Sequence, residues 1–177
     1  MQLKIKVPIS EWRSPAKGEK VYAQGKTPIG DVTLTRQASA NLAVHARADA
    51  WEDWKVGNGD TEYLLVRDFG APGVLSQRLL KRGLAGQFEG EVVKVAVNSS
   101  ISRKSRYVRF DFPRDRLTFL PYRLGVHLIN HHREIIAIRQ NGQWEFSGSS
   151  PKNVLTVCLF EWGEMDYFLR NPLIRQL

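Results

Sequence analysis

The fold is decided by one stretch of the chain, IIAIRQNGQWEFS at residues 135–147. Two strand-like segments flank Asn141-Gly142, a dipeptide that readily supplies the two positive φ angles of a type I′ turn. We therefore expect a two-residue β-hairpin in which Arg139 lies opposite Trp144. A cation–π contact between these two side chains would be structural. The natural consequence of the stretch is an antiparallel sheet.

Alternation of apolar and polar residues, the signature of a half-buried strand, extends outward from this hairpin. It is clear at Val93, Val95 and Val97, and again from Lys104 to Phe112. The region from Pro8 to Gly30 is rich in proline and glycine, which indicates mostly loop. Besides the hairpin, we expect strands at residues 1–7, 20–24, 31–35, 63–69, 93–97 and 104–112.

Three segments are candidates for helices. The Ala-rich segment from Ala38 to Lys55 has apolar residues spaced four apart, although residues 41–45 within it could equally form a strand. The segment from Pro72 to Gly83 has a helical pattern that begins with proline. The segment from Val154 to Leu169 is apolar at either period. It is therefore either a buried strand followed by a short helix, or one buried helix.

These elements predict an α+β fold, mostly antiparallel β, as a sheet or partly closed barrel with two or three helices, including a possible buried C-terminal one. The order of many strands followed by an apolar C-terminal segment is similar to the tubby-like architecture, in which a barrel closes around a helix. A chain of 177 residues can bury one substantial core, so residues 1–177 are expected to form a single domain.

The net charge of +8 is concentrated in the middle of the chain. Residues 67–123 hold twelve Lys or Arg against five Asp or Glu, an excess of seven, whereas the flanking segments are nearly neutral. A local basic field concentrates a polyanionic partner, although it can also serve only solubility.

The most distinctive basic stretch is SRKSRYVRFDFPRDR at residues 102–116. On a strand from Lys104 to Phe112, alternation turns Val108 and Phe110 toward the core, and Tyr107 and Arg109 to the other face. Cations along a phosphate track, with an aromatic ring for stacking, suit a nucleic acid. The candidate nucleic-acid-binding residues are Arg103, Lys104, Arg106, Tyr107, Arg109, Arg114 and Arg116.

Three alternatives stay open for this protein. The arginines can belong to a solvated face and pair with Asp111 and Asp115, or the partner can be an anionic lipid or an acidic protein. A hydrolase or nuclease can also be built from the histidine cluster with Glu134 or Asp111. On a strand, however, His127 and His131 would be nearly 13 Å apart, at about 3.3 Å per residue. The cluster is His127, His131 and His132.

The motifs and segments that the sequence lacks limit the cellular compartment and the kinds of chemistry that we expect for this protein. The one cysteine, Cys158, stands in an apolar run, which predicts a buried and inert thiol. No phosphate-binding glycine loop, dinucleotide fingerprint or metalloprotease motif is present, and we expect no metal or other cofactor. No apolar segment has the length of a membrane span, about 20 residues. The expectation is a cytoplasmic, non-enzymatic binding module for a polyanion, with nucleic acid as the leading candidate.

Overall fold

A computed structural model describes residues 4–5, 20–38, 52–59, 62–69, 82–123 and 125–173 of the chain. The strands are β1 (Lys4–Ile5), β2 (Lys20–Thr27), β3 (Gly30–Ala38), β4 (Glu52–Asn58), β5 (Glu62–Val66), β6 (Leu84–Phe88), β7 (Glu91–Asn98), β8 (Tyr107–Phe112), β9 (Asp115–Tyr122), β10 (Gly125–Ile129), β11 (Ile135–Gln140) and β12 (Gln143–Phe146). The helices are η4 (Arg103–Ser105), α2 (Pro151–Trp162) and η5 (Met165–Leu169), of which η4 and η5 are 3-10 helices.

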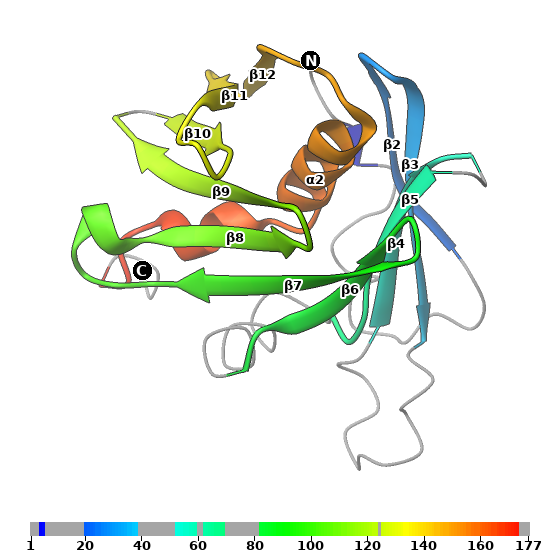
Figure 1. Ribbon diagram of the computed structural model, residues 1–177, viewed down its shortest axis with the longest axis horizontal. Coiled ribbons are helices and arrows are strands. Elements are labelled where there is room, and N and C mark those ends of the chain that lie inside the picture. The colour runs from blue at the N-terminus through cyan, green and yellow to red at the C-terminus, as the bar shows by residue number, and fades with distance from the viewer. Residues whose placement is uncertain are drawn as a thin grey trace.

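All twelve strands form one sheet, in which each strand pairs antiparallel with the next along the chain. The sheet bends strongly, so that β2 to β5 stand nearly upright in Figure 1 while β7 and β8 run across the view, with α2 between them. Among the described residues β1 and β12 are the two ends of the strand order and do not pair with each other. The mostly antiparallel β prediction is confirmed, as an open sheet that curls around a helix.

The C-terminal apolar segment is one buried helix followed by a 3-10 turn, which resolves the alternative that the pattern left open. Ser150 caps α2 by accepting a hydrogen bond from the backbone N–H of Asn153, and Pro151 occupies the first turn. Every residue from Val154 to Phe160 is buried. A helix that is apolar all round is stable only when it is enclosed, and here the curved sheet encloses it.

The described residues contain one complete α-helix, α2, and the two 3-10 helices, so the predicted count of two or three helices is not matched in this part of the chain. The end of the helix expected from Ala38 to Lys55 is instead strand β4, and residues 39–51 lie outside the described residues. Trp54 and Val56 point into the core and pair with β3 and β5. Burial of these two alternating side chains outweighs the helical spacing of the alanines. Of the helix expected from Pro72 to Gly83, residues 72–81 are also outside the described part.

The hairpin prediction is confirmed residue by residue. β11 and β12 pair with Arg139 opposite Trp144 and Ala137 opposite Phe146, around a turn with positive φ at Asn141 and Gly142. The Arg139 guanidinium lies 5.9 Å from the Trp144 ring centroid. This cation–π contact is partly buried, because Trp144 is only 2 % exposed.

The buried hydrophobic side chains form one continuous core between α2 and the sheet. At its centre the rings of Phe119 and Phe160 stack with centroids 3.9 Å apart, and Trp144 meets both rings edge-on. Cys158 is fully buried as predicted, and burial raises the pKa of its thiol. None of the helices in the described segments has the length and apolar character needed to cross a membrane.

Candidate anion-binding site

The structure divides the predicted basic stretch into two parts. Residues Arg103–Ser105 form the short helix η4, and Arg106 follows it, so strand β8 begins only at Tyr107. From there the predicted alternation is confirmed, with Val108 and Phe110 fully buried and the intervening side chains facing outward. Residues before and after Arg106 therefore face different surroundings.

On the outer face of β8 two arginines are paired with one carboxylate. Arg109 Nε donates to one oxygen of Asp111 at 2.9 Å, and Arg116 Nε donates to the other at 2.7 Å. The Arg109 guanidinium also lies 5.3 Å from the centroid of the Tyr107 ring. This surface keeps an excess of one positive charge, and a nucleic acid would have to compete with Asp111 for both arginines.

Among the described ion pairs, Asp115 contacts neither of these arginine side chains, although it accepts a hydrogen bond from the backbone N–H of Arg116. It accepts a hydrogen bond from Lys152 at the start of α2, and its Oδ1 lies 2.7 Å from His131 Nδ1. Burial alone would raise the pKa of Asp115, but these two contacts and the backbone N–H of Arg116 together lower it. The cluster joins the β8–β9 and β10–β11 turns to α2.

Two further candidates for nucleic-acid binding, Lys104 on η4 and Arg114 in the β8–β9 turn, are exposed.

The other candidates, Arg103 and Arg106, open onto a pocket of about 420 Å³. Five arginines and one aspartate give its lining a formal excess of four positive charges. Arg106, Val126 and Leu169 of this lining are buried, whereas Arg103, Arg123 and Arg170 are exposed. The lining residues are Arg103, Arg106, Pro121, Arg123, Gly125, Val126, Arg139, Asp166, Leu169 and Arg170.

Arg106 is the buried member of this group, with only 8 % of its surface exposed. Its guanidinium donates to the carbonyl oxygens of Ser100 at 2.7 Å, Ile101 at 2.6 Å and Leu169 at 3.2 Å. The side chain thereby fastens the loop before η4 to the end of η5. Carbonyl oxygens fix the guanidinium in place but carry no net charge, so its positive charge is not neutralised by these contacts.

The five arginines differ in how far carboxylates neutralise them. Arg139 contacts Glu161 at 2.7 Å and Asp166 at 3.2 Å, and Arg170 contacts Asp166 at 3.0 Å. In contrast, Arg103 donates to the backbone carbonyl of Arg123 at 2.7 Å. The ion pairs within the described part of the chain include neither of these two arginines nor the buried Arg106. Three arginines without an ion pair among the described residues therefore meet at the pocket.

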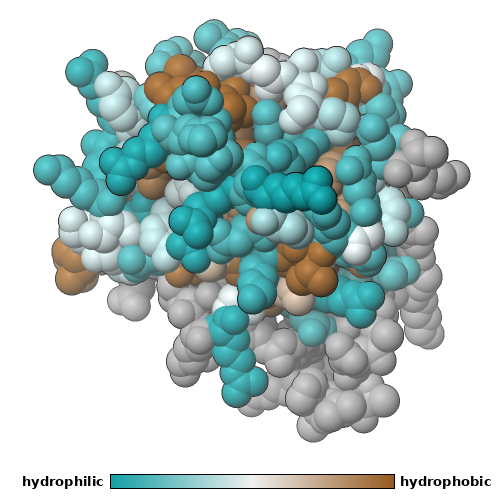
Figure 2. Space-filling view, viewed as in Figure 1, coloured by the Kyte–Doolittle hydropathy of each residue, from teal (hydrophilic) through white to brown (hydrophobic). Residues whose placement is uncertain are grey.

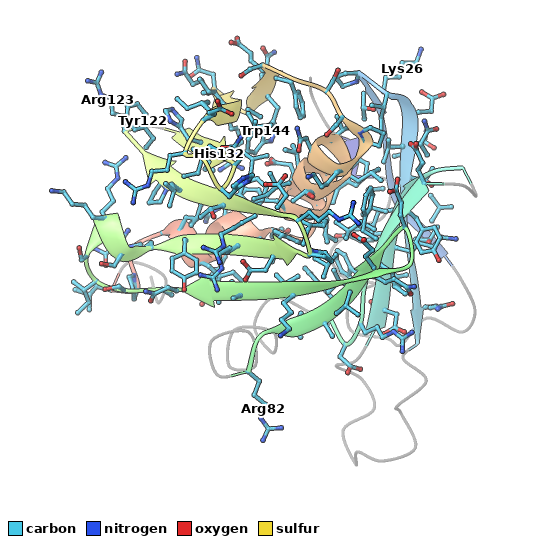
Figure 3. The ribbon with its side chains drawn as sticks, viewed as in Figure 1. Lys26, Arg82, Tyr122, Arg123, His132 and Trp144 are labelled. Atoms are coloured by element: carbon cyan, nitrogen blue, oxygen red, sulfur yellow. The ribbon has the colours of Figure 1, made fainter. Side chains whose placement is uncertain are left out.

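Two aromatic rings stack at the β9–β10 hairpin, outside the pocket lining and on the face opposite the side chains of Pro121 and Val126. The Tyr122 ring stacks on His127 with centroids 4.0 Å apart, and Arg123 places its guanidinium 5.6 Å from the centroid of Tyr122. Tyr122 is 45 % exposed. Burial lowers the pKa of His127, which keeps this ring neutral at pH 7. Tyr122 and Arg123 both project from the end of this hairpin in Figure 3.

Gly125 lets β10 approach its neighbour closely at the pocket wall. A Cβ atom at this position would lie 2.0 Å from the carbonyl oxygen of Arg139. Glycine is thus required for the β10–β11 pairing that holds Arg139 at the pocket.

The histidine cluster does not come together as a metal site. His127 stacks on Tyr122, whereas His131 and His132 lie in the next turn with their ring centroids 3.7 Å apart. No group of three or more His, Cys, Asp or Glu side chains that could hold a metal was found in the described segments. The metal-dependent alternative therefore gains no support from this part of the molecule.

Sequence reasoning did not assign Tyr122, Arg123, Arg139 or Arg170 to the site. Arg123 belongs to the basic middle third, but the residues around it have no pattern that singles it out. Arg139 and Arg170 lie in segments of zero net charge and reach the pocket only through the fold. A signal for Tyr122 was present, since Pro121-Tyr122-Arg123 sets an aromatic residue beside a cation.

No protein-family model matches the chain, and no curated protein or solved structure shows significant similarity to it. The case for a function therefore rests on the residues and geometry of this chain.

Proposed function

We propose that this protein is a non-enzymatic module that binds a nucleic acid, with the arginine pocket and the Tyr122 ring as its contact surface. The observation that carries the proposal is the meeting of Arg103, Arg106 and Arg123 at one pocket, where no described carboxylate pairs with them. The exposed Tyr122 ring lies next to one of them, Arg123. Phosphates need cations, and bases need a flat surface on which to stack.

The predicted strand surface has a secondary role in this proposal. Arg109 and Arg116 already share Asp111, so their charge is partly satisfied before any ligand arrives. Exposed Lys104 and Arg114 extend the positive field away from the pocket. Hydrophilic residues cover most of the visible face, with separate hydrophobic patches between them (Figure 2). Electrostatic attraction over such a surface speeds the encounter with a polyanion, while the pocket supplies the contacts.

The test is a fluorescence anisotropy titration with a labelled single strand of about 12 nucleotides, at salt concentrations from about 50 to 200 mM. We expect measurable affinity at the low end and a steep loss of affinity with salt. The double variant R103A/R123A removes two cations and should make the slope of log K against log[salt] shallower by about 1.4, which is 0.7 for each lost contact with a single strand.

The matched control is K26A/R82A, which removes the same number of exposed positive charges elsewhere. Lys26 and Arg82 lie at other edges of the molecule, away from Tyr122 and Arg123 (Figure 3). This control should change the affinity little. The proposal fails when the protein shows no affinity near about 50 mM salt, or when both double variants weaken binding equally.

An anionic membrane surface is the second candidate, favoured by one observation. Ile101 is 67 % exposed and Leu173 is 68 % exposed. Ile101 is tied to the pocket through Arg106, and Leu173 follows Leu169 of the pocket lining closely. Exposed apolar side chains beside arginines suit an anionic lipid surface. Pelleting with vesicles that contain phosphatidylserine, without any oligonucleotide binding, would favour this alternative.

A further inference from the structure

We infer that the contact surface extends from Tyr122 over the outer face of strands β8 to β11, where the unpaired bases of a single nucleic-acid strand stack. This inference rests on the proposed function and names the form of the ligand, a strand whose bases are free. The surface is separate from the arginine pocket, because it lies on the opposite face of the β9–β10 hairpin. We call it the outer platform, and its residues are Tyr107, Leu120, Tyr122, His127, Ile129 and Ile138.

The register of the strands places four residues of the outer platform in one row. Leu120 on β9 pairs with His127 on β10, which pairs in turn with Ile138 on β11. The β8–β9 register, continued by one residue, sets Tyr107 beside Leu120. Most residues that alternate with this row are buried on the inner face, which packs against α2 (Figure 1). The row therefore points away from the core.

The outer platform is apolar at positions where a sheet is typically polar. An antiparallel sheet with one face on the core usually carries polar residues on the other face. Here Leu120, Ile129 and Ile138 occupy outward positions around His127, and all four side chains are half-buried. Burial also lowers the pKa of His127. Apolar patches with a charged rim are typical of interaction sites.

Two tyrosine–arginine pairs lie on this face. The Arg109 guanidinium is 5.3 Å from the centroid of Tyr107, and that of Arg123 is 5.6 Å from the centroid of Tyr122. The two tyrosines are diagonal neighbours on β8 and β9, so their backbones are about 7–8 Å apart. Successive nucleotides of a duplex strand are only about 3.4 Å apart along the axis. Rings at the wider spacing suit bases that have left their stack, which a single strand provides.

The arginines along the edge of the outer platform keep N–H donors for phosphate oxygens. Arg109 and Arg116 each donate their Nε–H to Asp111. Among the described contacts their terminal NH₂ groups have no protein acceptor, and these groups hold the other four N–H donors of each guanidinium. With Arg123, three arginines stand against one carboxylate, a formal excess of two positive charges. Flat bases joined by phosphates complement both the rings and this charge, whereas an acidic peptide complements only the charge.

The experiment is a competition assay in which two unlabelled strands displace a labelled oligothymidylate of about 12 nucleotides. One competitor is the same oligothymidylate, and the other has the same length and number of phosphates but abasic sugars throughout. We expect the strand with bases to compete at least about tenfold better than the abasic strand, because a single stacked base contributes an effect of this order.

Variants assign this difference to the outer platform. Y107L/Y122L keeps apolar side chains but removes both flat rings, so the ratio between the two competitors should fall close to one. Its slope of log K against log[salt] should stay unchanged, because no cation is lost. The matched control is Y63L, since Tyr63 on β5 also has a cation beside it, with Lys55 Nζ 4.8 Å from the ring centroid. This control should leave the ratio unchanged, and circular dichroism checks that both variants are folded.

The outcomes separate the inference from the proposed function. Equal competition by the two strands would overturn the inference while leaving nucleic-acid binding intact. A ratio that Y107L/Y122L leaves unchanged, or that Y63L lowers as much, would overturn it in the same way. Absence of binding by both strands would overturn the proposed function and this inference with it.

Discussion

The substitution R106K tests whether Arg106 holds the pocket together. Lysine keeps the positive charge but replaces a planar group of five donors by one ammonium group, so it cannot reach three carbonyl oxygens at once. In the folded protein these oxygens belong to Ser100, Ile101 and Leu169. The Leu169 contact joins segments separated by 63 residues, and its loss frees η5 from the loop before η4.

The size of the effect follows from these three contacts. A hydrogen bond that involves a charged group contributes about 1.5–3 kcal/mol, and lysine can retain one of the three. Rehydration of the part-buried carbonyls of Ser100 and Ile101 offsets part of the loss. We therefore expect R106K to lower the free energy of unfolding by roughly 2–4 kcal/mol.

Urea unfolding followed by tryptophan fluorescence measures this difference. The control is R103K, because Arg103 is exposed and donates to one carbonyl oxygen. Its effect should stay below about 1 kcal/mol. A free energy of unfolding for R106K within about 0.5 kcal/mol of the original protein, the usual range for surface substitutions, would refute the structural role given to the Arg106 guanidinium.

Three further predictions concern the core, the pocket wall and the dependence on pH. F160A should destabilise the protein by about 3–5 kcal/mol, because it removes the ring stacked on Phe119, and calorimetry would show this as a lower Tm. G125A should cost roughly 1–3 kcal/mol in urea unfolding, since its Cβ meets the carbonyl of Arg139 and the strands have to separate. D115N should lower stability at pH 7 by roughly 1–3 kcal/mol. Because folding lowers the pKa of Asp115, its contribution is present above the ordinary value of 3.8 and is lost as the pH falls through the folded pKa. The difference in unfolding free energy between D115N and the original protein should therefore be present at pH 7 and shrink as the pH is lowered below 3.8; a gap that stays constant with pH would contradict the assignment.

The elements that the sequence predicts well are those whose determinants are local. The Asn141-Gly142 turn sets the hairpin register by its own geometry, so the pairing of Arg139 with Trp144 follows without knowledge of the rest. The inner and outer faces of β8 follow for the same reason, because alternation is a property of the strand itself.

The elements that it predicts poorly depend on distant partners. Trp54 sits at a helical spacing from the alanines before it, yet β3 and β5 bind its backbone on both sides. The apolar run in α2 has no period to read, although Ser150-Pro151 ahead of it has the chemistry of a helix start. Attention to that cap would have favoured the helix over the strand.

The sequence predicted only some of the arginines of the candidate site, for a related reason. Arg103 and Arg106 stand in the basic stretch, but the fold brings them to Arg139 and Arg170 from segments with no charge excess. A meander places the loop before β8 close to the β9–β10 turn. The following helix then returns the C-terminal segment to β8. No count of charges along the chain can predict that convergence.

Charge that is counted in the sequence and charge that is available to a ligand are different quantities in this protein. Asp111 already satisfies Arg109 and Arg116, so two conspicuous cations of the basic stretch have part of their binding capacity in use. Arg106 is held by carbonyl oxygens, which order the guanidinium without neutralising it. An ordered cation loses less conformational entropy when a ligand arrives. Under the proposed function, the buried arginine, which contributes least to the surface charge, would therefore lose the least conformational entropy on binding an anion.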